Sequence, residues 1–259
     1  MIQPIKRLGQ NFLQDPNTIR KIVDSLEAET DSRVIEIGPG TGALTRLLSE
    51  RYPDFMAIEI DPRAVEWLSQ ELPGVVVAQG DVLEVDWVDL AKNAPENKVS
   101  VIGNLPYYIT SQILFGLLDA ALVIREAVIM MQYEVAARLT AAPRTKDYGI
   151  LSVATQLACK PKLLFPVSRN VFYPKPDVKS AIVRLEFPQT AAEQRVNPEW
   201  LRRIIRSAFN QRRKTLRNSL SGILNEVQMG LPEELGAKRA EELSPQEFVD
   251  LALYLQKAV

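Results

Sequence analysis

Short apolar runs rich in β-branched residues alternate along most of the chain with segments in which apolar residues recur every three or four positions. The runs predict buried strands, and the periodic segments predict amphipathic helices. The expected strands are residues 34–37, 55–61, 75–81, 99–103, 127–131, 163–167 and 183–187, and the expected helices between them are 16–26, 43–48, 62–71, 110–118 and 149–157. This alternation predicts an α/β fold with a Rossmann-like sheet.

The pattern changes after the last expected strand. Residues 188–192 (PQTAA) have the composition of a linker, and beyond them residues 198–224 and 232–259 predict helices only. We therefore expect an α/β domain over residues 1–188 and a small C-terminal α-helical domain over residues 189–259.

A glycine-rich loop follows the first of these strands, with Gly38, Gly40 and Gly42 at alternate positions. Such glycines let the backbone turn sharply and approach a ligand closely. The spacing differs from the G-x-G-x-x-G of dinucleotide sites, and Pro39 removes an N–H group that a pyrophosphate would need. The loop therefore suits a ligand with an amino-acid end and no phosphate. It disfavours a nicotinamide-dependent dehydrogenase, an alternative that a cofactor titration would test.

Polar residues end the strands that follow. Glu59 lies about twenty residues beyond the loop, the offset of a carboxylate that binds ribose hydroxyls. Asp81 ends the next strand, where it can accept a hydrogen bond from an adenine amine. A single acid at a strand end is usually a solvated charge, but several suitable strand ends in succession favour a binding site. A nucleoside with an uncharged linker and an amino-acid tail fits these groups best, so we expect S-adenosylmethionine as the cofactor.

The segment Asn104-Leu105-Pro106-Tyr107 offers the groups needed to methylate an exocyclic amine on a base. The Asn104 side-chain oxygen and the Leu105 carbonyl, which Pro106 directs outward, can accept hydrogen bonds from the two N–H groups of the amine. Tyr107 supplies a flat face for a base removed from its stack. Alone, the four residues are better explained by a proline-containing turn with a buried tyrosine. The neighbouring cofactor motif favours the catalytic interpretation.

Together these motifs resemble the bacterial small-subunit ribosomal RNA adenine dimethyltransferases, and the resemblance runs through nearly the whole chain. It also rests on residues 9–15 (GQNFLQD), 132–136 (QYEVA), 171–176 (VFYPKP) and 208–217 (AFNQRRKTLR). It implies a Rossmann-like S-adenosylmethionine-dependent methyltransferase that dimethylates N6 of two adjacent adenosines in the 3′-terminal hairpin loop of 16S rRNA during small-subunit maturation. The family often has Phe where Leu8 stands and Lys where Tyr133 stands.

The resemblance also implies roles for individual residues. Asn11 and Leu13 would cover the cofactor, and Gly38 and Gly40 would approach its methionine end. Glu59 would hold the ribose, Asp81 the adenine amine, and Asn104 would border both ligands. The expected catalytic group is Asn104, Leu105, Pro106, Tyr107 and Phe172, with Phe172 stacking on the target base opposite Tyr107.

The charge distribution modifies this picture. The net charge of −1 and the pI near 5.8 lack the basicity expected of an RNA-binding protein. Basic side chains are concentrated in one segment, however, and can serve as a phosphate-binding patch or as a solvated helix face. The expected RNA contacts are Arg202, Arg206, Arg212, Arg213, Lys214 and Arg217, with a weaker second surface at Lys6, Arg7, Arg20 and Lys21.

Composition narrows the mechanism. The chain has no histidine and a single cysteine, Cys159, which excludes a histidine base and a multi-cysteine zinc site. We expect no metal, because methyl transfer from a sulfonium depends on positioning rather than on a strong base.

The chain shows no signal peptide and no apolar run long enough to span a bilayer. We therefore expect a cytoplasmic protein, and we expect it to be a monomer.

Two further hypotheses stay open. The related 23S rRNA adenine-N6 methyltransferases of the macrolide-resistance type share the cofactor pocket and the Asn-aromatic motif, although residues 208–217 resemble the 16S family more. Growth with and without a macrolide separates the two. The other hypothesis is a ribosome-assembly factor whose catalysis is incidental, which the intact segment 104–107 disfavours.

Overall fold

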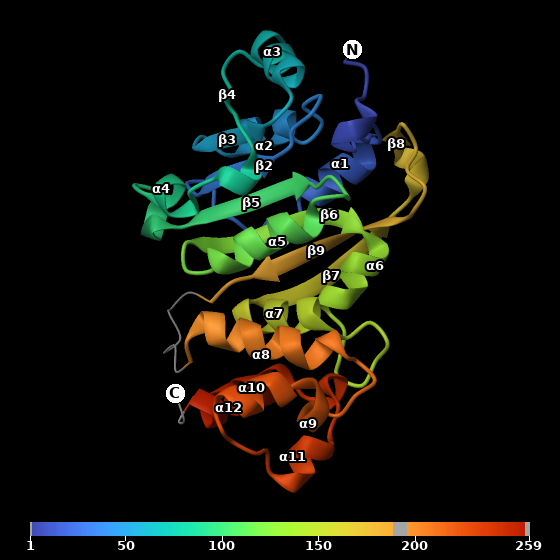
Figure 1. The fold of residues 1–259 in the computed structure, drawn as a ribbon. Coiled ribbons are helices and arrows are strands. Elements are labelled where there is room, and N and C mark those ends of the chain that lie inside the picture. Colours follow the sequence, from blue (N-terminus) through green and yellow to red (C-terminus); the bar gives the residue numbers. More distant parts are fainter. Residues whose placement is uncertain (1, 189–195, 257–259) are drawn as a thin grey trace. The chain divides into compact units, whose positions relative to one another are not determined.

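The computed structural model describes residues 2–188 and 196–256, and the chain divides into two compact units (Figure 1). The first unit comprises residues 1–136 and 159–189, and the second comprises residues 137–158 and 190–259. The boundary therefore differs from the one expected at residue 188, because residues 137–158 belong with the C-terminal helices. The expected linker lies outside the described residues, apart from Pro188.

A seven-stranded sheet forms the centre of the first unit. The strand order is β4 (Val76–Gln79), β3 (Phe55–Glu59), β2 (Arg33–Ile37), β5 (Val99–Asn104), β6 (Ile124–Gln132), β9 (Ser180–Glu186) and β7 (Lys160–Val167). The first five strands are parallel, and β9 is antiparallel to both of its neighbours. All seven expected strands are present, and the α/β architecture is confirmed.

The sheet has a topological switch point between β2 and β5. The chain moves outward from β2 through β3 to β4 and then returns to the other side of β2 as β5. Loops that leave a switch point in opposite directions open a crevice at the carboxyl ends of the strands, where ligands bind in open α/β sheets. Gly103 allows the close approach of the two strands there, since a Cβ atom on it would lie 2.7 Å from the Ile37 carbonyl oxygen.

Helices join the strands and bury both faces of the sheet. They are α1 (Pro16–Val23), α2 (Thr45–Arg51), α3 (Pro62–Glu71), α4 (Trp87–Ala91), α5 (Thr110–Asp119) and α6 (Tyr133–Leu139), the last of which contains the point where the chain leaves the first unit. Adjacent residues of β2, Val34 and Ile35, are both fully buried. Because successive side chains point to opposite faces, both faces are covered, as is usual for a parallel sheet.

The first unit also contains elements that the sequence pattern did not predict. A two-stranded ribbon pairs β1 (Phe12–Leu13) with β8 (Phe172–Tyr173), and the short 3-10 helices are η1 (Lys6–Leu8), η2 (Val82–Glu84), η3 (Pro95–Asn97) and η4 (Arg169–Val171). Strands of two residues that lie far apart in the chain carry no periodicity, so only tertiary pairing defines them.

The second unit is helical. It contains α7 (Ile150–Ala158), α8 (Pro198–Asn210), α9 (Leu216–Ser219), α10 (Ser221–Glu226), α11 (Glu233–Ala237), η5 (Ala240–Glu242) and α12 (Pro245–Gln256). Tyr148 shows why residues 137–158 belong here: its hydroxyl donates to the Leu243 carbonyl at 2.8 Å, and its ring lies 6.2 Å from that of Phe209. Phe209 in turn stacks on Phe248 with ring centroids 5.7 Å apart.

The two long helices expected in the second unit are interrupted. The first breaks at residues 211–215, where Arg212 donates to the Thr145 carbonyl and Thr215 forms a β-bridge with Arg239. No apolar residue occurs between Phe209 and Leu216, so no buried stripe holds this stretch in the helix. The second breaks into α11, η5 and α12.

Three expectations drawn from composition can be compared with the structure, within the described residues only. No helix among them is long and apolar enough to cross a membrane. No group of three or more Asp, Glu or Cys side chains within these ranges is placed to hold a metal ion. Cys159 is buried, and burial raises the pKa of its thiol to about 12, so it stays protonated and packs as a small apolar side chain.

Candidate active site

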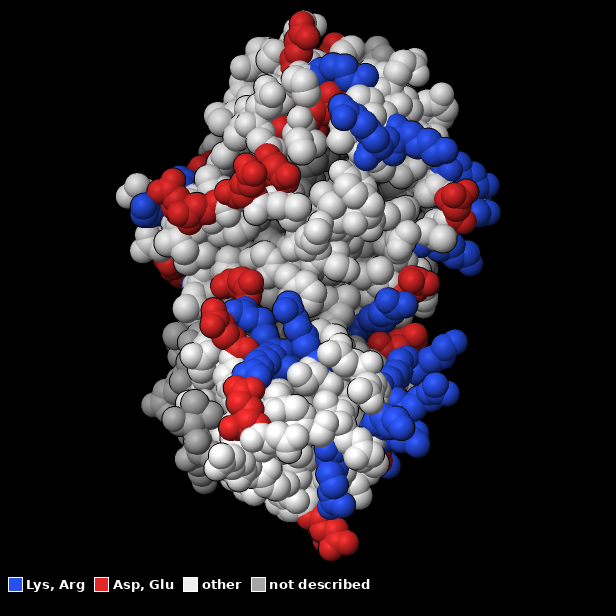
Figure 2. All heavy atoms as spheres, in the orientation of Figure 1, with Lys and Arg blue, Asp and Glu red and all other residues white. Residues whose placement is uncertain are grey.

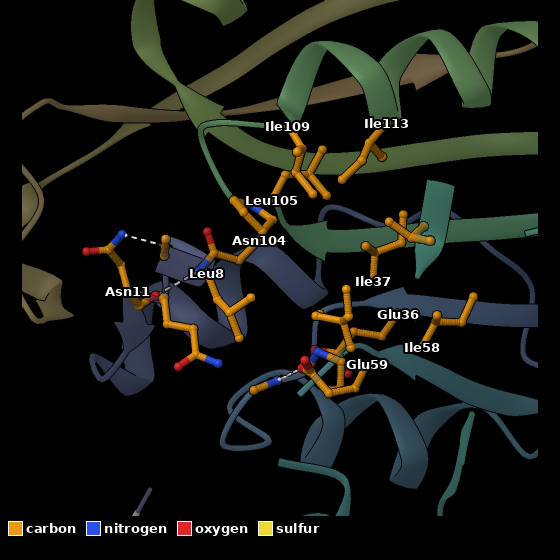
Figure 3. Close-up of a pocket in the computed structure, with 18 of the residues that line it drawn as sticks. Leu8, Asn11, Glu36, Ile37, Ile58, Glu59, Asn104, Leu105, Ile109 and Ile113 are labelled. Atoms are coloured by element: carbon orange, nitrogen blue, oxygen red, sulfur yellow. Dashed lines mark hydrogen bonds between the residues drawn. The ribbon is translucent and has the colours of Figure 1, made fainter. Parts of the chain in front are cut away.

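A pocket opens at the carboxyl ends of β2, β3 and β5, beside the segment that precedes β1 (Figure 3). Ten residues predicted from the sequence line this one pocket: Asn11, Leu13, Gly38, Gly40, Glu59, Asp81, Asn104, Leu105, Pro106 and Tyr107. They come from four strand ends and the N-terminal segment. The pocket therefore coincides with the crevice that the sheet topology requires.

The glycine loop adopts a conformation that only glycine takes without strain. Gly38, Gly40 and Gly42 have φ angles of 66°, 55° and 83°, in the left-handed region. A Cβ atom on Gly40 would also lie 2.9 Å from Cε1 of Phe12. The loop can thus pass under β1 and bring its backbone to the pocket wall.

The Glu59 carboxylate is anchored by backbone groups. Oε2 accepts from the Gly40 N–H at 3.0 Å, and Oε1 accepts from the Asp61 N–H at 2.9 Å. Burial raises the pKa of Glu59, while the two backbone donors partly oppose that rise. Each carboxylate oxygen keeps a second lone pair, so a vicinal diol in the pocket can donate to Glu59 without displacing the loop.

Asp61 ties the N-terminal segment to the sheet, a link that sequence reasoning missed. Its carboxylate accepts from Gln10 Nε2 at 2.8 Å and from Arg63 Nη2 at 2.7 Å. The Arg63 guanidinium holds the pKa of Asp61 down at about 2. The segment before Asn11 is therefore fastened beside the pocket by a charged group that stays ionised.

The Asn104 amide has a defined orientation. Its Nδ2 donates to the backbone carbonyl of Asn11 at 3.0 Å, and the Asn11 side chain donates to the Gly9 carbonyl at 3.0 Å (Figure 3). An amide whose nitrogen is occupied in this way presents its oxygen as an acceptor. Asn104 is half-buried and lines the pocket, so this oxygen is available to a ligand amine.

The turn after Asn104 is rigid. The Pro106 carbonyl accepts from the Thr110 hydroxyl at 2.9 Å and from the Ile109 N–H at 3.3 Å. The Tyr107 hydroxyl lies 2.7 Å from Ser180 Oγ on β9, and Ser180 is fully buried. The Tyr107 ring is therefore fixed at the pocket wall, which suits a platform for a flat ligand.

Asp81 and Phe172 occupy different environments. Asp81 is partly exposed at the pocket and accepts from the Leu83 N–H at 2.9 Å, which leaves its second oxygen available. Phe172 is only 5% exposed and packs in the core with Leu13, its partner in the β1–β8 ribbon. Phe172 does not line the pocket with Tyr107. Stacking of Phe172 on a base stays a prediction, and its packing supports a structural role.

Glu36 is a pocket residue that sequence reasoning passed over. It is 2% exposed, and its Oε2 accepts from Thr45 Oγ1 at 2.7 Å. Burial raises its pKa to about 8, and the nearby Glu59 carboxylate adds to that rise. Glu36 is therefore mainly protonated at neutral pH. The available signal was a single acid inside an otherwise apolar run.

The basic side chains of the second unit fall into two groups. Arg212 pairs with Glu241 at 2.7 Å, and Arg217 lies against Gly236. Within the described part of the chain, Arg206, Arg213 and Lys214 are exposed and form no ion pair. Figure 2 shows Lys and Arg side chains spread over the visible face of the helical unit, some beside acidic ones. Arg202 is also exposed.

Exposed basic side chains also gather on the first unit near α1 and β8 (Figure 2). The predicted Lys6, Arg7, Arg20 and Lys21 are all exposed, and so are Lys175 and Lys179, which follow β8 in the chain and which sequence reasoning missed. Lys21 lies over the Phe165 ring at 3.9 Å. The first unit therefore exposes more basic side chains near α1 and β8 than the sequence analysis singled out.

Comparison with known proteins places the chain in a family. The family model "Ribosomal RNA adenine dimethylase" matches residues 3–257. "Ribosomal RNA small subunit methyltransferase A" of Salinibacter ruber is 49% identical over 255 residues, which cover 98% of this chain and 85% of that protein. The protein of the same name from Chlorobium phaeobacteroides is 46% identical, covering 95% and 89%.

Solved structures agree on the fold. A dimethyladenosine transferase from Plasmodium falciparum superposes with a TM-score of 0.79 at 24% identity, covering 95% of this chain and 98% of that one. The 23S rRNA methyltransferase ErmE superposes with a TM-score of 0.68 at 29% identity, covering 95% and 100%. With a family model that spans nearly its whole length and relatives of this similarity, the chain belongs to the ribosomal RNA adenine dimethylase family.

Proposed function

We propose that the chain transfers methyl groups from S-adenosylmethionine to N6 of two adjacent adenosines in the 3′-terminal hairpin loop of 16S rRNA. The observation that carries this proposal is the orientation of Asn104, whose amide nitrogen is held by the Asn11 carbonyl at a strand end in the switch-point crevice. The names of the curated relatives support the small-subunit RNA as the substrate.

The pocket residues fit S-adenosylmethionine. Glu59 has lone pairs left for the ribose hydroxyls, and Asp81 has an oxygen left for the adenine amine. The left-handed loop at Gly38 and Gly40 brings backbone close to an amino-acid end without presenting a phosphate cradle. When bound, the cofactor supplies an electrophilic methyl group on a positively charged sulfur.

The chain's own contribution is to expose the nitrogen lone pair of the target amine. That lone pair is delocalised into the adenine ring, so the amine is a poor nucleophile. Hydrogen bonds from its two N–H groups to the Asn104 oxygen and the Leu105 carbonyl favour a pyramidal nitrogen, whose lone pair is no longer conjugated with the ring. The nitrogen then forms a bond to the methyl carbon while the carbon–sulfur bond breaks and its electrons stay on sulfur.

The amine proton leaves after the methyl group has arrived. No histidine exists in the chain to accept it, and a methylated ammonium on adenine is acidic enough to lose a proton to water. Tyr107 holds the base flat through this step, because its ring is fixed by the Ser180 contact. After the first transfer only one N–H group remains on this nitrogen, so the second methyl transfer needs only one hydrogen-bond acceptor.

The basic surfaces support RNA as the partner. Arg206, Arg213 and Lys214 in the second unit, and Lys6 and Arg7 in the first, are exposed and can contact phosphates. We propose that the enzyme acts on the immature small subunit as a monomer and without a metal ion.

Methyl transfer to 23S rRNA is the second candidate, and the likeness to ErmE is the observation that favours it. The experiment that separates the two incubates the protein with labelled S-adenosylmethionine and either small or large subunits that lack the modification. Nucleosides are then mapped by mass spectrometry. The proposal expects dimethyladenosine in the small subunit only. Label in the large subunit alone contradicts it.

A further inference from the structure

Tyr108 is a large aromatic residue at the pocket that the mechanism does not use. It follows Tyr107 in the turn between β5 and α5, lines the same pocket, and is 58% exposed. Tyr107 is half-buried and hydrogen-bonded to Ser180, whereas no residue of the described chain pairs with the Tyr108 hydroxyl. The ring therefore contributes little to the stability of the fold, and most of it faces solvent.

The ring is nevertheless held in place on one side. A Cβ atom on Gly9 would lie 3.2 Å from Cδ1 of Tyr108, so the ring packs against the Gly9 backbone. Gly9 has a φ angle of 61° and ends η1. A side chain at that position would push the ring away. The Tyr108 ring is thus supported by the N-terminal segment while the rest of it stays open.

Basic residues directly precede the glycine on which this ring packs. Lys6 and Arg7 are the two residues of η1 with exposed side chains, and η1 ends at the glycine on which Tyr108 packs. An open aromatic face beside basic side chains at the mouth of a pocket is the arrangement that binds single-stranded nucleic acid, with a base on the ring and phosphates on the charges.

We propose that Tyr108 is a second base platform, on which the nucleotide next to the target adenosine stacks while the target lies in the pocket. This inference rests on the proposed function. The two target adenosines of that substrate are adjacent, and the neighbour assigned to Tyr108 is the one on the side of the other target. The platform would keep the second adenosine unstacked from the RNA and close to the pocket between the two rounds of dimethylation.

The test compares four proteins on small subunits that lack the modification: wild type, Tyr108→Ala, Tyr108→Leu and Tyr108→Phe. Leucine keeps apolar bulk against Gly9 without an aromatic face, and phenylalanine keeps the face without the hydroxyl. Leu122→Ala is the matched control, because Leu122 is 51% exposed and precedes β6 at the opposite, amino-terminal end of the strands. The measurements are KM for subunits, affinity for S-adenosylmethionine, and the fraction of subunits with one or two dimethyladenosines.

Loss of a base–aromatic stack weakens single-strand binding by about tenfold. We expect Tyr108→Ala and Tyr108→Leu to raise KM for subunits by about that factor, to leave cofactor affinity unchanged, and to accumulate subunits with a single dimethyladenosine. Tyr108→Phe and Leu122→Ala should match wild type. The inference is overturned if Tyr108→Leu is normal, or if the alanine variant loses cofactor affinity, which would make Tyr108 a support for the N-terminal segment. Failure of the wild type to methylate small subunits would instead refute the proposed function itself.

Discussion

The amide nitrogen of Asn104 donates to the backbone carbonyl of Asn11 at 3.0 Å, across 93 positions of the chain. This bond joins the end of β5 to the N-terminal segment, which Gln10 fastens to Asp61. It also decides which end of the Asn104 amide faces the pocket. The acceptor needed for amine chemistry is therefore set by the tertiary structure rather than by the local motif.

Glu59→Ala should weaken binding of S-adenosylmethionine by about 1.5–3 kcal/mol, the scale of hydrogen bonds to a charged group. Because Glu59 also anchors the N–H groups of Gly40 and Asp61, alanine removes loop support as well. Glu59→Gln is the matched variant, since it keeps the shape and one acceptor. Isothermal titration calorimetry should rank affinity as wild type, then glutamine, then alanine. Unaltered affinity in both variants would mean that the ribose binds elsewhere.

Glu36→Gln should make the protein's stability less dependent on pH. The folded-state pKa of Glu36 is raised to about 8 from an ordinary 4.5. Below the lower value both states are protonated, and stability is unaffected. Between the two values the folded state keeps a proton that the unfolded state has lost, so stability falls as pH rises. The glutamine variant does not lose stability in this way, and its side-chain oxygen can still accept a hydrogen bond from the Thr45 hydroxyl.

As the pH rises from 5 to 8, the free energy of unfolding of Glu36→Gln should therefore increase relative to that of wild type by on the order of 3 kcal/mol. Thermal unfolding midpoints at both pH values measure this difference. The variant keeps some pH dependence, because burial raises the pKa of Glu126 to about 7 as well. An equal pH dependence in the two proteins would show that Glu36 is ionised in the folded state.

Substitutions at Tyr107 and Phe172 distinguish a platform for the target base from a packing role in the core. Phe172→Ala should lose about 3–5 kcal/mol of stability, since the ring packs in the core with Leu13. Tyr107→Phe keeps the ring and should lose about 1 kcal/mol, because Ser180 is left without its partner. Unfolding and methylation are measured together. A Phe172→Ala protein that stays stable but does not methylate would instead support Phe172 as a platform for the base.

The basic segment of the second unit is tested by salt dependence. Reversing Arg206, Arg213 and Lys214 to Glu should weaken RNA binding and lower the slope of log affinity against log salt by about 2–3, because fewer counterions are released. Arg203→Glu is the control, since Arg203 is already paired with Glu226. Cofactor affinity should stay the same in both proteins. Equal slopes and affinities for variant and wild type would make the segment a solvated helix face.

Much of the fold and the site could be predicted from the sequence because both depend on local pattern. Apolar runs mark the strands, and parallel strand ends must meet at one edge of the sheet. The pairing of Tyr107 with Ser180 and the packing of Phe172 depend on contacts between distant segments, which carry no local signal. Residues 137–158 were misplaced for the same reason, since Tyr148 finds its partner at Leu243.

Asn104→Ala gives the most direct test of the account. The variant should bind S-adenosylmethionine and small subunits nearly as well as wild type but methylate at least about a hundredfold more slowly, because one well-placed acceptor at the reacting amine is lost. The decisive measurement is the single-turnover rate of dimethyladenosine formation on unmodified small subunits, with both ligands saturating and the product mapped by mass spectrometry. Wild type should form two adjacent dimethyladenosines, and the variant should form almost none in the same time. Full dimethylation by Asn104→Ala would contradict it.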